Sequence, residues 1–327
     1  MPITSVTKDP DNLTMTVVAD FPVPVRRLWD AYADPRQIEK FWGPVEYPAT
    51  FFRHDMAVGG ESHYTMHGPD GDTSSGWWEF LEVVEGERFA VLDGFANPDG
   101  TKSDFAPPMR MDFVFESTPD GSRLTTTTLF ASLETLEQMI EMGMEEGMQS
   151  AMSQIDAVLA DLASFAAGRG TDTQILSDTQ VRVARVIGGT VDQVWQAHHD
   201  SDQLRRWLTG PDGWEMTECE LTDQVGGSYH YSWAPAGGGE GAFGLGGELI
   251  ESAPPHREVT TERMLGTDGP STLNEMTLTP TTGGTLLSLV ITYPDAELRD
   301  QILGTGMVDG MEASYARMER ELLTVVP

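Results

Sequence analysis

The chain carries the same ordered series of short motifs twice, at a spacing of about 165 residues. The first pair aligns Trp29 with Trp195, and the others follow in the same order: Gln37-Ile-Glu-Lys-Phe-Trp with Gln203-Leu-Arg-Arg-Trp-Leu, Gly59-Gly-Glu-Ser-His-Tyr with Gly226-Gly-Ser-Tyr-His-Tyr, Glu82 and Arg88 with Glu251 and Arg257, and Gly143-Met-Glu-Glu-Gly-Met with Gly306-Met-Val-Asp-Gly-Met. The 327 residues also exceed one ordinary domain of about 150 residues. We therefore predict one domain over residues 1–166, a linker over 167–178 and a second domain over 179–327.

Each half has the pattern of a strand, two short helices, several strands and one long helix. In the first half, Leu13–Asp20 alternates as a strand does, and Pro24 and Asp34-Pro35 mark the starts of two short helices. Three alternating runs then predict strands with one buried face: Ser62/Tyr64/Met66, Trp78/Phe80 and Met109/Met111/Phe113/Phe115. Short turns such as Pro119-Asp-Gly favour antiparallel pairing.

The last segment of each half has helical spacing. Residues 133–165 place Met148, Met152, Ile155 and Leu159 on one face, and the second half repeats this with Met311, Tyr315, Met318 and Leu322. An antiparallel sheet with one long helix buries its apolar face against that helix. The sequence therefore predicts an α+β fold in each half, with the sheet wrapped around the C-terminal helix.

Composition narrows the classes of partner. The net charge of −32 repels phosphate backbones and anionic lipid, so nucleic acid and membrane surfaces are not expected partners. The longest apolar runs are too short to span a bilayer, and residues 1–20 show no secretory signal, which predicts a cytoplasmic protein. Cys219 is the single cysteine, which excludes intramolecular disulfides, and we interpret it as a small strand residue.

Several strings resemble a known family. Phe41-Trp-Gly-Pro, Leu81-Glu-Val-Val-Glu-Gly-Glu-Arg and Met142-Gly-Met-Glu-Glu-Gly resemble the bacterial domains named after the activator of the heat-shock-protein-90 ATPase, within the START-like helix-grip (SRPBCC) superfamily. The second half resembles a sister branch through Val225-Gly-Gly-Ser-Tyr-His-Tyr-Ser-Trp and Pro254-Pro-His-Arg. The resemblance spans residues 13–165 and 179–324 and implies two helix-grip domains. Because that superfamily holds ligand carriers, cyclases, self-resistance proteins and co-chaperones, the fold does not choose a reaction.

Two histidines recur at the same place in both halves, His63 and His230. A histidine there is a candidate acid or base, but alternation with the inward Tyr64 and Tyr231 predicts that both point outward. We expect the adjacent His198 and His199, near a helix end, to diverge, and we predict no metal site.

Three carboxylates are further catalytic candidates: Glu82, Asp93 and Glu251. Glu82 and Glu251 each precede an arginine by six residues, which predicts cross-strand ion pairs with Arg88 and Arg257, and the alternative is a carboxylate at a cavity mouth. Residues 239–244 match a dinucleotide-binding pattern, but a strand follows instead of a helix, so no cofactor is predicted.

The predicted ligand site is the apolar wall of each cavity. The glycine pairs Gly143/Gly147 and Gly306/Gly310 bear on it, because glycine costs a helix interior about 1 kcal/mol relative to alanine. Either the helix approaches the sheet closely there, or space is left beside it. The predicted wall comprises Trp42, Tyr64, Met66, Trp78, Phe80, Phe113, Gly143, Met144, Met148, Tyr229, Tyr231, Trp233, Leu249, Gly306, Met307 and Met311.

We expect these cavities to bind a small hydrophobic or aromatic molecule. Two other functions remain open at this stage. One is a metal-free enzyme, a cyclase, aromatase or hydrolase of secondary metabolism, or a self-resistance protein. The other is an interaction module of co-chaperone type, which is disfavoured because nothing before Leu13 resembles the chaperone-gripping domain of the eukaryotic protein.

Overall fold

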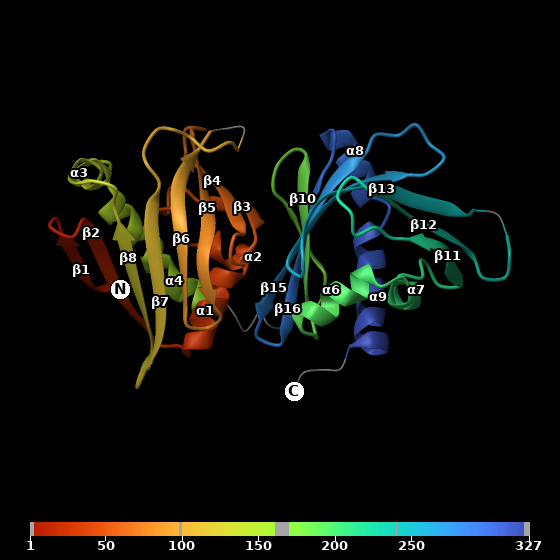
Figure 1. Cartoon of the computed structure of the whole chain (residues 1–327), viewed down its shortest axis with the longest axis horizontal. Helices are drawn as coiled ribbons and strands as arrows, with labels where there is room; N and C mark the ends of the chain where they lie inside the picture. Colours follow the sequence, from red (N-terminus) through yellow and green to blue (C-terminus); the bar gives the residue numbers. More distant parts are fainter. Residues whose placement is uncertain (1–2, 98–99, 161–169, 240, 324–327) are drawn as a thin grey trace. The chain divides into compact units, whose positions relative to one another are not determined.

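The computed structural model describes residues 3–97, 100–160, 170–239 and 241–323 (Figure 1). The chain divides into two compact units, Met1–Ala167 and Gly168–Pro327. Within the described residues, each unit contains one eight-stranded antiparallel sheet together with helices. No helix among these residues is both long and apolar enough to cross a membrane.

The first unit has the strand order β1-β2-β8-β7-β6-β5-β4-β3. Its strands are β1 (Ile3–Asp9), β2 (Thr14–Phe21), β3 (Ala49–His54), β4 (Glu61–His67), β5 (Thr73–Val84), β6 (Arg88–Ala96), β7 (Met109–Thr118) and β8 (Gly121–Leu129). Its helices are α1 (Val25–Ala33), α2 (Pro35–Ile38), α3 (Leu133–Glu141) and α4 (Met144–Ala160). The two short helices come between β2 and β3, as predicted, and Asp34 caps α2 by accepting a hydrogen bond from the Arg36 backbone N–H.

The core of the first unit lies between the sheet and α4. Met111, Phe113 and Phe115 alternate inward along β7, and all three are buried. Met152 and Ile155 of α4 belong to the same hydrophobic cluster. Figure 1 shows the strands of this unit curving around α4. The predicted grip of a sheet on a C-terminal helix is confirmed.

The second unit has the strand order β11-β12-β13-β14-β15-β16-β10-β9. Its strands are β9 (Asp172–Ile175), β10 (Gln180–Ile187), β11 (Trp214–Glu220), β12 (Ser228–Pro235), β13 (Phe243–Ala253), β14 (Arg257–Met264), β15 (Thr272–Thr281) and β16 (Gly284–Thr292). Its helices are α6 (Val191–His199), α7 (Ser201–Trp207), α8 (Ala296–Leu303) and α9 (Met307–Leu322). Tyr315 and Met318 of α9 pack in one cluster with Leu278 and Leu287 of the sheet, so α9 is the gripped helix here.

A long C-terminal helix is confirmed in each unit, as α4 and α9, but the range 133–165 predicted as one helix is not continuous. In the first unit it is divided into α3 and α4, and in the second unit α8 precedes α9 in the same way. Gly143 and Gly306 stand at the two breaks with φ of +88° and +82°, a left-handed conformation that side chains other than glycine seldom adopt. These two glycines therefore redirect the chain instead of leaving space inside a helix. Residues 161–165 of the predicted helix lie outside the described residues.

Gly306→Ala and Gly310→Ala are expected to change stability in opposite directions. An added Cβ meets no other atom within 4 Å at either position, so packing does not decide the outcome. Alanine at Gly306 must adopt the left-handed backbone conformation, which strains a residue with a Cβ, and it should destabilise the second unit by about 1 kcal/mol. Alanine at Gly310, inside α9, should stabilise it by up to about 1 kcal/mol. Thermal unfolding of both variants checks this, and shifts of the same sign would contradict the assignment.

Two edge strands were not predicted from the sequence. β1 precedes the predicted first strand, and β9 lies within residues 167–178, which were predicted to be a linker. Their burial patterns lack the inward alternation of the central strands, because both lie at a sheet edge and most of their residues are exposed. β1 and β9 are therefore recognised by their hydrogen bonds to β2 and β10, and not by a hydrophobic pattern in the sequence.

Candidate functional site

The second unit contains a cavity of about 320 Å³ between its sheet and the helices α6, α7 and α9. Apolar side chains form most of the wall: Leu204, Trp207, Leu208, Leu221, Trp233, Leu245, Leu249, Met276, Leu289, Ile291, Met307 and Met311. The polar or amphipathic side chains are His198, His199, Thr222, Tyr229, Tyr231, Glu258, Thr260, Glu262, Asn274, Ser314 and Tyr315. The volume lies within the range of small-molecule sites.

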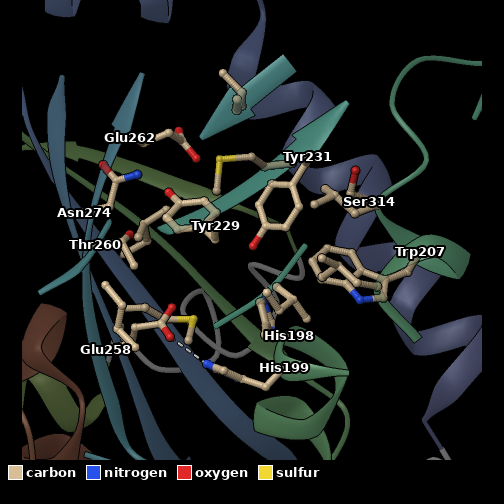
Figure 2. A pocket seen from close by; sticks show the side chains of 18 of the residues that line it. His198, His199, Trp207, Tyr229, Tyr231, Glu258, Thr260, Glu262, Asn274 and Ser314 are labelled. Carbon is tan, nitrogen blue, oxygen red and sulfur yellow. Dashed lines mark hydrogen bonds and ion pairs between the residues drawn. The ribbon is translucent and has the colours of Figure 1, made fainter. Parts of the chain in front are cut away.

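Alternation along two strands places five of these polar or amphipathic side chains. β12 presents Tyr229, Tyr231 and Trp233 to the cavity, and β14 presents Glu258, Thr260 and Glu262. Each set consists of every second residue, which is the condition for pointing to one face of a sheet. Figure 2 shows the side chains of both strands gathered around the same space.

Two adjacent histidines at the end of α6 both line this cavity. Nδ1 of His198 and Nδ1 of His199 each lie 2.8 Å from a backbone carbonyl one helical turn earlier, and a carbonyl can only accept, so Nδ1 carries the proton in both rings. Nε2 of His199 lies 2.7 Å from Glu258 Oε2 (Figure 2). The expectation that these histidines diverge is therefore wrong, because side chains about 100° apart on one turn both reach the wide cavity.

The surroundings shift the pKa values of the two rings in opposite directions. Burial lowers the pKa of His198 to about 4, so this ring is neutral near pH 7 and Nε2 is a hydrogen-bond acceptor. Burial also acts to lower the pKa of His199, but the hydrogen bond and the negative charge of Glu258 outweigh it and raise the pKa overall. The His199 ring is also stacked on Trp195, with ring centroids 3.9 Å apart. When His199 is protonated, which the raised pKa favours, it forms an ion pair with Glu258 at the cavity wall.

Glu262 is the other carboxyl group of this cavity. Burial raises its pKa, and a hydrogen bond from Asn274 offsets this in part. The Thr272 hydroxyl donates to Asn274 Oδ1 at 2.9 Å, which leaves the Asn274 amide N–H groups to face Glu262. The Tyr229 hydroxyl is engaged elsewhere, because it donates to the Thr261 carbonyl at 2.9 Å.

The first unit has two apolar hollows, each smaller than the cavity of the second unit, with one carboxyl group in their shared wall. Two adjoining hollows of about 180 and 280 Å³ share Tyr64, Met66, Asp93 and Met144 in their walls. Asp93 Oδ1 accepts hydrogen bonds from Trp78 Nε1 at 2.8 Å and from the Tyr64 hydroxyl at 3.3 Å. Burial nevertheless raises the pKa of Asp93 to about 6, and the two hydrogen bonds limit the rise.

Both cavities lie within segments that match one protein family. The model for the family described as Activator of Hsp90 ATPase homolog 1-like protein matches residues 22–160 and 189–322, which together form most of the chain. The chain belongs to this family. It contains two such domains in tandem, which confirms the resemblance and the repeat inferred from the sequence. Every residue that lines the cavities falls within the matched segments.

Solved structures similar to this chain cover about half of it. One is protein Ms6760 from Mycobacterium smegmatis, with 45% identity, a TM-score of 0.46 and coverage of 48% of this chain and 97% of that one. Another is a protein from Arthrobacter aurescens, with 41% identity, a TM-score of 0.47 and coverage of 48% and 92%. A third, from Rhodobacter sphaeroides, has 30% identity, a TM-score of 0.44 and coverage of 47% and 97%. No curated protein matches the sequence.

Most of the side chains predicted to bind a ligand line the cavities of the two family domains. In the first domain these are Trp42, Tyr64, Met66, Phe113, Gly143, Met144 and Met148, and in the second Tyr229, Tyr231, Trp233, Leu249, Met307 and Met311. Trp78 and Phe80 are instead buried in the core behind the first cavity, and the Trp78 ring contacts Trp42 with centroids 4.5 Å apart. Gly306 lies at the break between α8 and α9, outside the described cavity walls.

Four of the catalytic candidates lie away from the cavity walls. Glu82 pairs with Arg88 at 2.7 Å, and Glu251 pairs with Arg257 at 2.6 Å, the cross-strand ion pairs expected for this spacing. His63 lies 3.2 Å from Glu61, and His230 lies 3.6 Å from Glu218, as expected for outward-facing rings. Of the five candidates, the structure places Asp93 in a cavity wall.

Sequence reasoning missed His198, His199, Glu258, Glu262 and Asn274. A signal for Glu262 was present: it follows Arg257 by five residues, as Asp93 follows Arg88, so both family domains hold a carboxyl group at the same place in the repeat. Alternation along β14 then carries Glu258 to the same face as Glu262. No sequence pattern of this kind identifies His199 as a site residue, because its partner Glu258 is 59 positions away in the chain.

Proposed function

We propose that the protein binds small hydrophobic or aromatic molecules in its helix-grip cavities, chiefly in the second unit. The observation that supports this most directly is the 320 Å³ cavity walled mainly by leucine, methionine and aromatic side chains. Transfer of an apolar ligand from water to such a wall is favourable by about 25 cal/mol per Å² buried. Met307 and Met311 add flexible thioethers, which adapt to ligands of different shape.

Calorimetric titration of the full chain with naphthalenemethanol, a neutral aromatic alcohol, tests this function. We expect saturable binding, because the bicyclic ring buries its surface against the cavity wall. Met311→Trp fills the second cavity and should weaken binding there at least tenfold. Met264→Trp is the matched control, because Met264 lies on β14 but is half exposed and outside the cavity wall. Absence of saturable binding, or equal binding by both variants in spectroscopically folded protein, would rule out the cavity as the site.

A metal-free enzyme is the second candidate, and the pair of histidines favours it. The neutral His198 ring offers a lone pair at Nε2, and the His199–Glu258 ion pair lies in the same cavity. Together, His198, His199 and Glu258 could transfer a proton to or from a bound molecule. If the protein converts a bound molecule, His198→Ala should abolish that turnover and leave the binding constant for the same molecule unchanged. This result would favour an enzyme over simple sequestration.

A further inference from the structure

The second cavity contains more carboxyl groups than basic side chains that could pair with them. Its wall holds two carboxyl groups, Glu258 and Glu262, while no lysine or arginine is among the lining residues of the described chain. Glu258 already has a partner, because its Oε2 lies 2.7 Å from Nε2 of His199. Glu262 has Asn274 as its hydrogen-bond donor, and an amide reduces the cost of a buried carboxylate without supplying a positive charge. A cationic group on a ligand would supply the positive charge that this carboxyl group lacks.

The surroundings of Glu262 suit an organic cation. Tyr229, Tyr231, Trp207 and Trp233 all contribute to the same wall, and aromatic faces attract ammonium groups. The Tyr231 hydroxyl points into the cavity in Figure 2 and has no hydrogen-bond partner among the described residues. This oxygen and the carboxylate are both hydrogen-bond acceptors for an ammonium group. A bare metal ion, in contrast, would lack ligands, because no group of three metal-binding side chains occurs in the described part of the chain.

The first unit repeats the arrangement. Asp93 on β6 occupies the place of Glu262 on β14, five residues after the matching arginine, and Tyr64 occupies the place of Tyr231. Here too, no lysine or arginine is among the described residues of the wall. A buried carboxyl group beside a tyrosine thus occurs in both cavities, although burying it opposes folding. The net charge of −32 acts in the same direction, because it draws cations toward the protein and repels anions.

We propose that the second cavity selects hydrophobic amines, with the ammonium group held between Glu262 and Tyr231 and the apolar body against the aromatic and methionine wall. This specificity rests on the proposed function, since it names the ligand class of the same cavity. The apolar wall gives affinity for any ligand of suitable size, whereas Glu262 distinguishes a cation from a neutral or anionic molecule.

Three ligands of nearly equal shape test the proposal: naphthylmethylamine, naphthalenemethanol and naphthoic acid. Calorimetry on the full chain at pH 7 should give at least tenfold tighter binding of the amine than of the alcohol, and the weakest binding for the acid. Equal affinities of amine and alcohol would overturn the amine proposal and leave the cavity function standing. Failure of both ligands to bind would overturn both proposals.

Two matched variants assign the selectivity to Glu262. Glu262→Gln keeps the shape and removes the charge, so the preference for the amine should fall to less than threefold while the affinity for the alcohol stays within twofold. Glu248→Gln, at an exposed glutamate of β13 outside the cavity wall, is the matched control and should leave the amine preference within threefold. A Glu262→Gln protein that still prefers the amine tenfold would overturn the assignment, and circular dichroism confirms that both variants are folded.

Discussion

At pH 8, Asp93→Asn is expected to stabilise the first unit by about 3 kcal/mol. Burial raises the pKa of Asp93 from 3.8 to about 6, so folding favours the protonated carboxyl group. A difference of about 2 pKa units corresponds to about 3 kcal/mol at roughly 1.4 kcal/mol per unit. Asparagine has nearly the same shape, can accept the Trp78 hydrogen bond and does not ionise.

The sign of the pH dependence follows from the raised pKa. Below pH 3.8, Asp93 is protonated in both the folded and the unfolded chain, and its burial carries no ionic cost. As the pH rises from 3.8 to about 6, Asp93 is ionised in the unfolded chain but still largely protonated in the folded chain, so the natural protein loses stability. Above about pH 6 the folded state is ionised as well, and the loss stops. The advantage of Asp93→Asn should therefore grow between these pH values and then stay constant.

Native-state hydrogen exchange of first-unit peptides at pH 5 and pH 8 measures this effect without interference from the second unit. Asp120→Asn, at an exposed turn, is the control and should change stability by less than about 0.5 kcal/mol at both pH values. An Asp93→Asn protein that is no more stable than the natural protein at pH 8 would show that water reaches Asp93 in the folded state.

Arg185→Met is expected to destabilise the second unit by about 2 to 4 kcal/mol. The Arg185 side chain on β10 is 8% exposed and binds Glu319 at 2.7 Å and Glu312 at 2.5 Å, both on α9. In a third contact, Arg185 Nη1 donates a hydrogen bond to the Glu312 backbone carbonyl at 3.2 Å. Removing one partner of a buried pair usually costs about 3 to 5 kcal/mol, and solvent at the two partly exposed glutamates reduces the loss.

The same substitution should loosen the cavity, because α9 carries Met307 and Met311. Faster hydrogen exchange is expected first in α9 and β10, together with a lower melting temperature. Arg320→Met is the matched control on the same helix: its side chain is 64% exposed, and its removal should cost less than about 1 kcal/mol. Equal melting temperatures for the two variants would show that apolar packing alone holds α9 in place.

Local patterns in the sequence account for the elements that were predicted correctly. Inward alternation identified β7, and the motif repeat identified two copies of one fold. These features depend on residues a few positions apart, or on comparison of the chain with itself. The division into α3 and α4 was missed because Gly143 fits a helical pattern by spacing, while its left-handed φ depends on where the helix must turn to lie on the sheet.

What the sequence determined by itself is the class of fold, the tandem repeat and the apolar character of each cavity wall, because burial of one strand face or helix face leaves a periodic pattern. Only the tertiary structure decided which polar groups meet inside the walls. Tyr64 and Asp93 are 29 positions apart, and His199 and Glu258 are 59 apart. Strand register and the position of α6 over the sheet set both contacts, and neither leaves a periodic signal in the chain. For the same reason, the charge imbalance around Glu262 became visible only in three dimensions.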